Sequence, residues 1–145
     1  MAMRLDYTKI APAGIKALGG VYGYIMECGL EQDLIEWVYL RVSQINKCPS
    51  CIDLSTGDLV NRGVSFDKLA LASVWRESPS MFTNREQAAL AWAETVTKVA
   101  DTAIPDEAYL AATAVFSSKE LVDLTIAIGL MNTYNRLGIS FLRDS

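Results

Sequence analysis

The chain of 145 residues contains no histidine, and this absence removes several kinds of active site. A structural zinc site normally takes four cysteine or histidine ligands. The chain offers only Cys28, Cys48 and Cys51, so it cannot complete such a site without carboxylates or a second subunit. The absence also excludes a serine or cysteine nucleophile that histidine activates, and any imidazole general base. We therefore expect no metal site, and any reactive side chain must be activated by other means.

Runs of basic residues and long apolar stretches are missing as well. Thirteen basic residues against seventeen acidic ones give a net charge of -4, and the basic residues are scattered, so we expect no nucleic-acid partner. The uncharged run Leu124–Asn135 has 12 residues, well short of the roughly 20 that span a bilayer. The first residues carry charges where a secretory signal needs an apolar core. These patterns predict a soluble protein of the cytoplasm without a membrane segment.

The sequence is rich in helical periodicity and has almost no alternation of the kind that strands show. Helix starts are marked by prolines at positions 12, 49 and 105 and by two capping boxes, Thr83–Glu86 and Ser117–Glu120. We expect helices at about residues 12–28, 31–46, 49–62, 66–76, 83–99, from 105 onward, and 117–135. Six or seven helices with short turns predict an all-α bundle, a single domain over residues 1–145.

Hydrophobic residues make up 51% of the chain, which is a large share for a domain of this size to bury alone. The helix expected at residues 31–46 is apolar on nearly every side. Such a helix is either buried or takes part in a subunit contact. We therefore expect a homo-oligomer.

The motif C-P-S-C at Cys48–Cys51 is the strongest chemical signal in the sequence. Pro49 disfavours helical geometry at the residue before it, so Cys48 should cap a helix in which Cys51 is the third residue. The free N–H groups and the dipole at a helix start favour a thiolate without any histidine. Two thiols at this spacing can also close a disulfide. The alternative reading is that both are ordinary core cysteines, a residue type that is often buried.

Glu36 is a second candidate, because it lies in the apolar segment L-I-E-W-V-Y-L. Partial burial would raise its pKa and make it a competent proton carrier. The alternative is an exposed or ion-paired glutamate of a helix. Cys28 has no nearby partner in the sequence and is expected in the core.

The segment E-W-V-Y-L-R-V-S-Q-I-N-K-C-P-S-C, residues 36–51, resembles the signature of the carboxymuconolactone decarboxylase and alkylhydroperoxidase D (AhpD) superfamily, on its peroxidase side. Residues 82–94 and 130–141 are similar to later blocks of that family. The resemblance implies an all-helical AhpD-like fold that assembles as trimers or hexamers. It also implies a peroxide-reducing dithiol that needs no cofactor and is itself reduced by a dithiol or a lipoyl-bearing partner protein.

The same resemblance implies roles for single residues. Cys51 matches the thiolate that attacks the peroxide, Cys48 the thiol that then closes the disulfide, and Glu36 the carboxylate of a proton relay. The chain departs from the family at Ser55, where the motif has a histidine four residues after the second cysteine. A hydroxyl there can pass a proton through water but cannot act as a base near neutral pH. General acid-base help is typically worth about 10²- to 10⁴-fold, so a slower peroxidase is expected.

Two other functions remain open at this point. One is a cofactor-free lactone decarboxylase from the sister branch of the superfamily, which fits the fold but not the paired cysteines. The other is a redox-sensing or purely structural oligomer that has kept the cysteines and lost efficient turnover.

Overall fold

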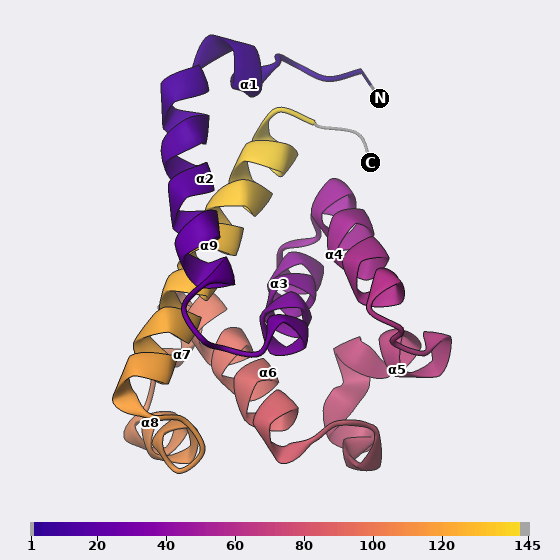
Figure 1. Ribbon diagram of the computed structural model, residues 1–145, viewed down its shortest axis with the longest axis vertical. Helices are drawn as coiled ribbons and strands as arrows, with labels where there is room; N and C mark the ends of the chain where they lie inside the picture. Colours follow the sequence, from indigo (N-terminus) through magenta and orange to yellow (C-terminus); the bar gives the residue numbers. More distant parts are fainter. Residues whose placement is uncertain (1, 143–145) are drawn as a thin grey trace.

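A computed structural model describes residues 2–142 of the chain (Figure 1). Within these residues all regular secondary structure is helical, as the periodicity predicted. The elements are α1 (Tyr7–Ile10), α2 (Pro12–Met26), α3 (Gln32–Asn46), α4 (Pro49–Asn61), α5 (Phe66–Leu71), the 3-10 turns η1 (Ala72–Glu77) and η2 (Pro79–Met81), α6 (Asn84–Thr97), α7 (Val99–Thr102), α8 (Asp106–Thr113) and α9 (Ser118–Ser140). None of the helices in this part of the chain is long and apolar enough to cross a bilayer.

The helix starts lie where local signals predicted them. The hydroxyl groups of Thr83 and Ser117 each accept from the backbone N–H of the glutamate three residues on, and their own N–H groups donate to that glutamate's carboxylate, so both capping boxes are confirmed. Pro12 and Pro49 occupy the first helical position of α2 and α4. Pro105 stands one residue earlier, as the N-cap of α8. The all-α fold class is therefore confirmed.

One predicted helix is wrong in its second half. The periodicity favoured a continuous helix at residues 66–76, but α5 ends at Leu71 and the chain continues as η1, with non-helical angles at Val74. The 3-10 turn aligns side chains three residues apart. Ala72 and Trp75 are thereby both buried against Trp37. Tertiary burial of the indole therefore overrides the helical pattern.

Two further differences concern single helical turns. The helix expected at residues 83–99 breaks at Lys98, after which α7 begins. The turn α1 was not predicted; the Asp6 side chain caps it by accepting from the N–H of Thr8. The backbone N–H of Arg4 donates to the Phe141 carbonyl at 2.9 Å, which brings the N-terminal segment to the end of α9.

Helix α3 is the centre of the bundle, as its nearly complete apolar ring predicted. One face packs with α2, α6, α8 and α9 in the larger core cluster, and the opposite face joins α4, α6 and η1 in the smaller one. Figure 1 shows α3 between α2 and α9 on one side and α4 on the other. A residue of α3 can therefore face the space that separates α2 from α4.

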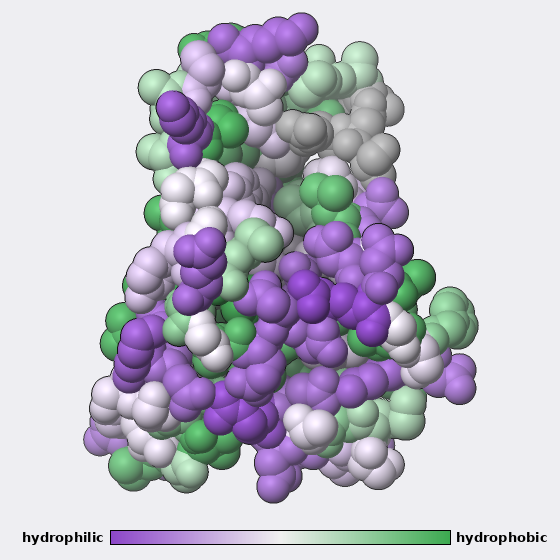
Figure 2. All heavy atoms as spheres, in the orientation of Figure 1, coloured by the Kyte–Doolittle hydropathy of each residue, from purple (hydrophilic) through white to green (hydrophobic). Residues whose placement is uncertain are grey.

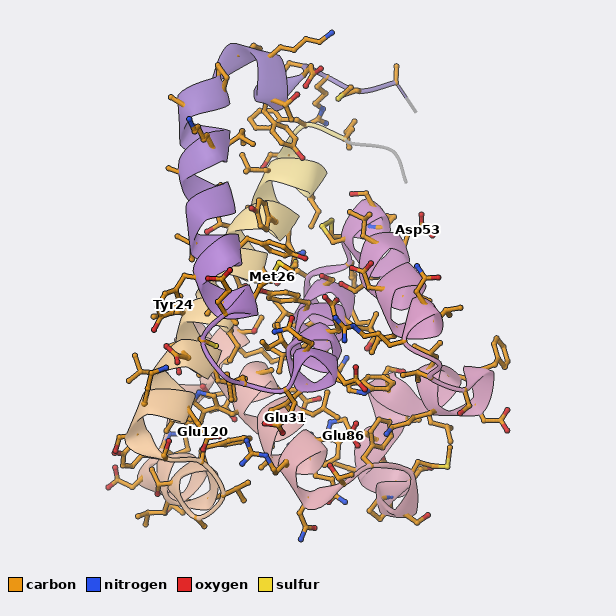
Figure 3. The ribbon with its side chains drawn as sticks, in the orientation of Figure 1. Tyr24, Met26, Glu31, Asp53, Glu86 and Glu120 are labelled. Atoms are coloured by element: carbon orange, nitrogen blue, oxygen red, sulfur yellow. A yellow bond between two sulfur atoms is a disulfide. The ribbon has the colours of Figure 1, made fainter. Side chains whose placement is uncertain are left out.

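Ion pairs that range from largely buried to exposed link the helices that surround α3. Arg41 donates to Glu94 of α6 at 2.7 Å, and Arg76 of η1 pairs with the same carboxylate. Arg85 of α6 binds Glu31, the N-cap of α3, at 2.8 Å and Glu120 of α9 at 2.6 Å (Figure 3). Ion pairs of this kind contribute little each. Together they link α3 to α6, η1 and α9 and so fix its orientation.

Candidate active site

The two cysteines of C-P-S-C form a disulfide at the first turn of α4. Cys48 is the N-cap, with extended angles φ -96° and ψ 101°, and Cys51 is the third helical residue, as predicted. Lys47 takes a left-handed conformation at φ 58°, which ends α3 and reverses the chain direction. Because of this geometry Cys51 lies close to the N–H groups at the start of α4, where a thiolate is stabilised after reduction.

A buried polar network holds the segment before Cys48 against α9. Asn135, fully buried in α9, donates to Ser43 Oγ at 3.0 Å and accepts from Asn46 Nδ2 at 2.9 Å. The N–H of Cys48 donates to the Ser43 carbonyl at 3.1 Å. The position of the disulfide is therefore set by α9 as well as by its own helix.

Helix α9 also approaches the sulfur atoms directly, at Gly138. A Cβ atom at this glycine would lie 3.1 Å from Cys48 Sγ and 3.4 Å from Ser50 Oγ. Real Cβ atoms essentially never lie closer than 3.0 Å to such a neighbour, so the backbone of α9 leaves little spare room. The absence of a side chain at Gly138 gives the sulfurs the space that they occupy.

Beside the disulfide lies a cavity of about 390 Å³. Five helices contribute to it, and its lining is Tyr7, Thr8, Ile15, Gly19, Tyr22, Glu36, Tyr39, Ser50, Cys51, Leu54, Ser55, Asp58, Met131 and Tyr134. Figure 2 shows the surface hollowed between α2 and α4 in the upper half of the view. Cys51 lines this cavity and is 8% exposed, whereas Cys48 is fully buried behind it. The two sulfurs are therefore not equivalent, since only Cys51 is open to a small molecule.

Glu36 projects from α3 into the same cavity and is only 6% exposed. Burial, reinforced by the nearby charge of Asp58, raises the pKa of its carboxyl from 4.5 to about 7. In the described part of the chain its Oε2 has no hydrogen-bond partner. Glu36 also borders a polar surface cleft formed with Gln32, Asn61 and Arg62. The carboxyl thus lies between the cavity and the surface, and its pKa suits the transfer of a proton near neutral pH.

Ser55 follows Cys51 by one turn of α4 and lines the cavity, 3% exposed. Of the four candidate residues, the structure therefore places Cys51, Glu36 and Ser55 on the cavity, with Cys48 directly behind. Cys28 is a free, half-buried thiol outside the cavity lining.

Several cavity residues were not singled out from the sequence. Tyr39 is 2% exposed, and its ring stacks on Tyr22 with centroids 6.1 Å apart. Tyr134 of α9 and Asp58 of α4 also belong to the polar part of the lining. One signal was present: Tyr39 lies three residues after Glu36 and so shares its face of α3. No group of three or more cysteine, aspartate or glutamate side chains able to hold a metal ion is found among residues 2–142.

Comparisons with known proteins agree with this architecture. Residues 12–95 match the sequence model of the carboxymuconolactone decarboxylase family. The chain is 30% identical over 140 residues to the uncharacterized protein YdfG of Bacillus subtilis, covering 97% of this chain and 95% of YdfG. It is 34% identical over 95 residues to the uncharacterized protein YnjA of Escherichia coli, covering 66% of this chain and 51%, about half the length, of YnjA.

A crystal structure extends the comparison to the fold. A protein of unknown function from Agrobacterium tumefaciens, which has been suggested to be the antioxidant defence protein AhpD, superposes with a TM-score of 0.94 at 39% identity. The superposition covers 99% of this chain and 97% of that protein. The AhpD-like fold predicted from the sequence is therefore confirmed.

Proposed function

The chain belongs to the carboxymuconolactone decarboxylase family, and on this premise we propose that it is a dithiol-dependent peroxide reductase. The observation that carries the proposal is the disulfide of Cys48 and Cys51 at a helix start, with only Cys51 open to a cavity that also holds Glu36. A thiolate at a helix N-terminus beside a carboxyl with a pKa of about 7 is suited to peroxide cleavage.

The two sulfurs take different roles in the reaction because they differ in exposure. In the reduced protein, the Cys51 thiolate attacks the terminal oxygen of a hydroperoxide, forming an S–O bond as the O–O bond breaks. The electron pair passes to the other oxygen, and a proton from Glu36 converts this alkoxide to an alcohol. Cys48 then attacks Cys51 Sγ, so that an S–S bond forms and water leaves. The first step takes two electrons from the Cys51 sulfur and completes the reduction of the peroxide. In the second step the Cys48 sulfur is oxidised while the sulfenic sulfur of Cys51 is reduced, so that both end at the oxidation level of a disulfide.

The cavity favours an organic hydroperoxide over hydrogen peroxide. Its volume of about 390 Å³ is far larger than the ~30 Å³ that one water molecule occupies in the liquid. Aliphatic and aromatic side chains, among them Ile15, Tyr22 and Met131, form much of the wall. An apolar chain bound there would be removed from water, with its peroxide group directed to Cys51.

The cycle needs a reductant, and we propose a dithiol or a lipoyl-bearing partner protein. Such a reductant attacks the disulfide through a mixed disulfide and leaves both cysteines reduced. The cytoplasm is the fitting compartment, because thiols are kept reduced there. A homo-oligomer, a trimer or hexamer, is part of the same proposal, supported by exposed apolar residues of α2, namely Val21, Tyr24 and Met26.

The test is peroxide consumption by the purified protein with excess dithiothreitol. C51S should abolish turnover, whereas C28S, which removes the half-buried thiol outside the cavity, should retain it. An unchanged rate in C51S would refute the proposal.

A second candidate is a redox sensor that is oxidised once and not turned over. It is favoured by Ser55, which cannot supply the base that an imidazole supplies. Rapid formation of the disulfide with one equivalent of peroxide, without multiple turnover in the presence of dithiol, would identify the sensor.

A further inference from the structure

Two buried oxygen atoms near the disulfide lack a hydrogen-bond partner. Within residues 2–142, the buried side-chain N and O atoms without such a partner are Glu36 Oε2 and Tyr39 Oη. Both residues line the cavity that Cys51 lines. Unpaired buried polar groups are rare in native proteins because they are destabilising. Their occurrence together, at one cavity and on one helix, indicates a place where a ligand supplies the missing partner.

Tyr39 is held firmly beside Glu36. Its ring stacks on Tyr22 at an interplanar angle of 19°, and the side chain is 2% exposed. Burial raises the pKa of its hydroxyl well above the ordinary value, and the groups that act on it are chiefly Tyr22, Glu36 and Tyr134, all on the same cavity. The hydroxyl therefore keeps its hydrogen throughout the physiological pH range and is a hydrogen-bond donor without an acceptor among the described residues.

The proposed reaction creates such an acceptor. When the O–O bond breaks, negative charge develops on the oxygen that leaves, in the cavity that the buried side chains of Glu36 and Tyr39 line. A fixed donor aimed at developing charge is among the largest contributions that an active site makes to rate. The chain has no imidazole for this task, and Ser55 lies on α4, on the helix of the nucleophile itself. A neutral hydroxyl from α3 meets the requirement.

We propose that Tyr39 is a further catalytic residue, whose hydroxyl donates a hydrogen bond to the peroxide oxygen that leaves as the alkoxide. The inference rests on the proposed peroxide reduction and adds one component to it. Cys51 Sγ bonds to the terminal oxygen, the O–O electron pair passes to the leaving oxygen, and Glu36 gives that oxygen its proton. Tyr39 keeps its own proton and stabilises the charge before the proton arrives.

The test compares Y39F with wild type in the fully reduced state, with Y109F as the matched control because Tyr109 is half exposed on α8, away from the cavity. Two second-order rates of Cys51 are measured: oxidation by cumene hydroperoxide, and alkylation by iodoacetamide, which needs the thiolate but creates no alkoxide. Melting temperatures are recorded as well. The substitution removes only an unpaired buried oxygen, so Y39F should melt no lower than wild type.

The expected result is a fall of about 10²-fold in the peroxide rate of Y39F, the size that loss of one oxyanion donor causes. Alkylation should change less than twofold, and Y109F should match wild type in both rates. A peroxide rate equal to that of wild type would overturn the role of Tyr39 and leave the peroxidase intact, and so would an equal fall in both rates. A wild-type protein whose Cys51 does not react with peroxide would overturn the proposed function and this inference with it.

Discussion

Replacing Glu36 with glutamine should change how the stability of the protein depends on pH. Glu36 is buried without a hydrogen-bond partner for Oε2, and its pKa is raised from 4.5 to about 7. The folded state therefore binds the proton more tightly than the unfolded state does. Glutamine has nearly the same shape as glutamate but does not titrate in this pH range. Comparison with E36Q therefore isolates the contribution of Glu36 protonation to the free energy of unfolding.

The expected magnitude follows from the two pKa values. Below pH 4.5 the carboxyl is protonated in both states, and burial of the neutral form carries no charge penalty. Between pH 4.5 and about 7 only the folded state keeps the proton, so rising pH lowers the free energy of unfolding by about 1.4 kcal/mol per pH unit. Above pH 7 the loss levels off. Wild type should therefore lose about 3 kcal/mol relative to E36Q between pH 4.5 and 8.

The assay is urea denaturation of the oxidised protein at several pH values from 4.5 to 8. Other titrating groups are common to both proteins and cancel in the difference. E107Q is the matched control, because Glu107 is an exposed glutamate of α8 that does not line the cavity. If the difference between wild type and E36Q is flat over this range, the raised pKa of Glu36 is refuted.

Three other substitutions, D58N, G138A and C48S, probe the same site, and G129A is the control for G138A. D58N removes the charge that, after burial, most raises the pKa of Glu36. The stability difference between D58N and E36Q should therefore level off at a lower pH than the difference between wild type and E36Q. Levelling off at the same pH would contradict this. G138A places a Cβ 3.1 Å from Cys48 Sγ and should cost about 1–3 kcal/mol in urea denaturation from overpacking. G129A on the same helix meets nothing within 4 Å and should gain up to about 1 kcal/mol from helix propensity; equal effects of the two alanines would contradict the close approach. C48S should let the sulfenic acid persist after one equivalent of peroxide, detected as a dimedone adduct by mass spectrometry, whereas wild type should give the disulfide without an adduct.

Local sequence signals predicted most of the helix starts because each depends on only a few neighbouring residues. Thr83 and Ser117 with their glutamates satisfy free N–H groups within one turn, and Pro49 fixes the start of α4 whatever surrounds it. The end of α5 depends instead on Trp75, which turns inward to contact residues of α3. That contact joins positions far apart in the chain, so no local pattern could indicate it.

The residues of the candidate site also fall into those that a local sequence pattern indicates and those that only the structure shows. Cys48, Cys51 and Glu36 were found because a short motif and a charged residue in an apolar segment are visible in one dimension. Tyr39 belongs to the helix that the sequence marks as apolar on nearly every side, and it is 2% exposed. The feature that singles out Tyr39 is that its buried hydroxyl has no hydrogen-bond partner among the described residues. Such a group is recognisable only when the positions of all neighbouring donors and acceptors are known.

The position and the pKa of the Glu36 carboxyl bear on the missing histidine. Imidazole serves proton transfer because its ordinary pKa is about 6.5. Burial brings the pKa of Glu36 to about 7, so a carboxyl here covers the pH range that imidazole covers in enzymes that use histidine. Proton transfer and charge stabilisation would then be divided, with Glu36 carrying the proton and Tyr39 holding the negative oxygen. If so, Ser55 does not leave the site without a proton-transferring group. Placing histidine there in S55H should therefore raise the peroxide rate by less than tenfold. An increase of the order of 10²-fold or more, the range that general acid-base catalysis spans, would show that Glu36 does not replace the imidazole.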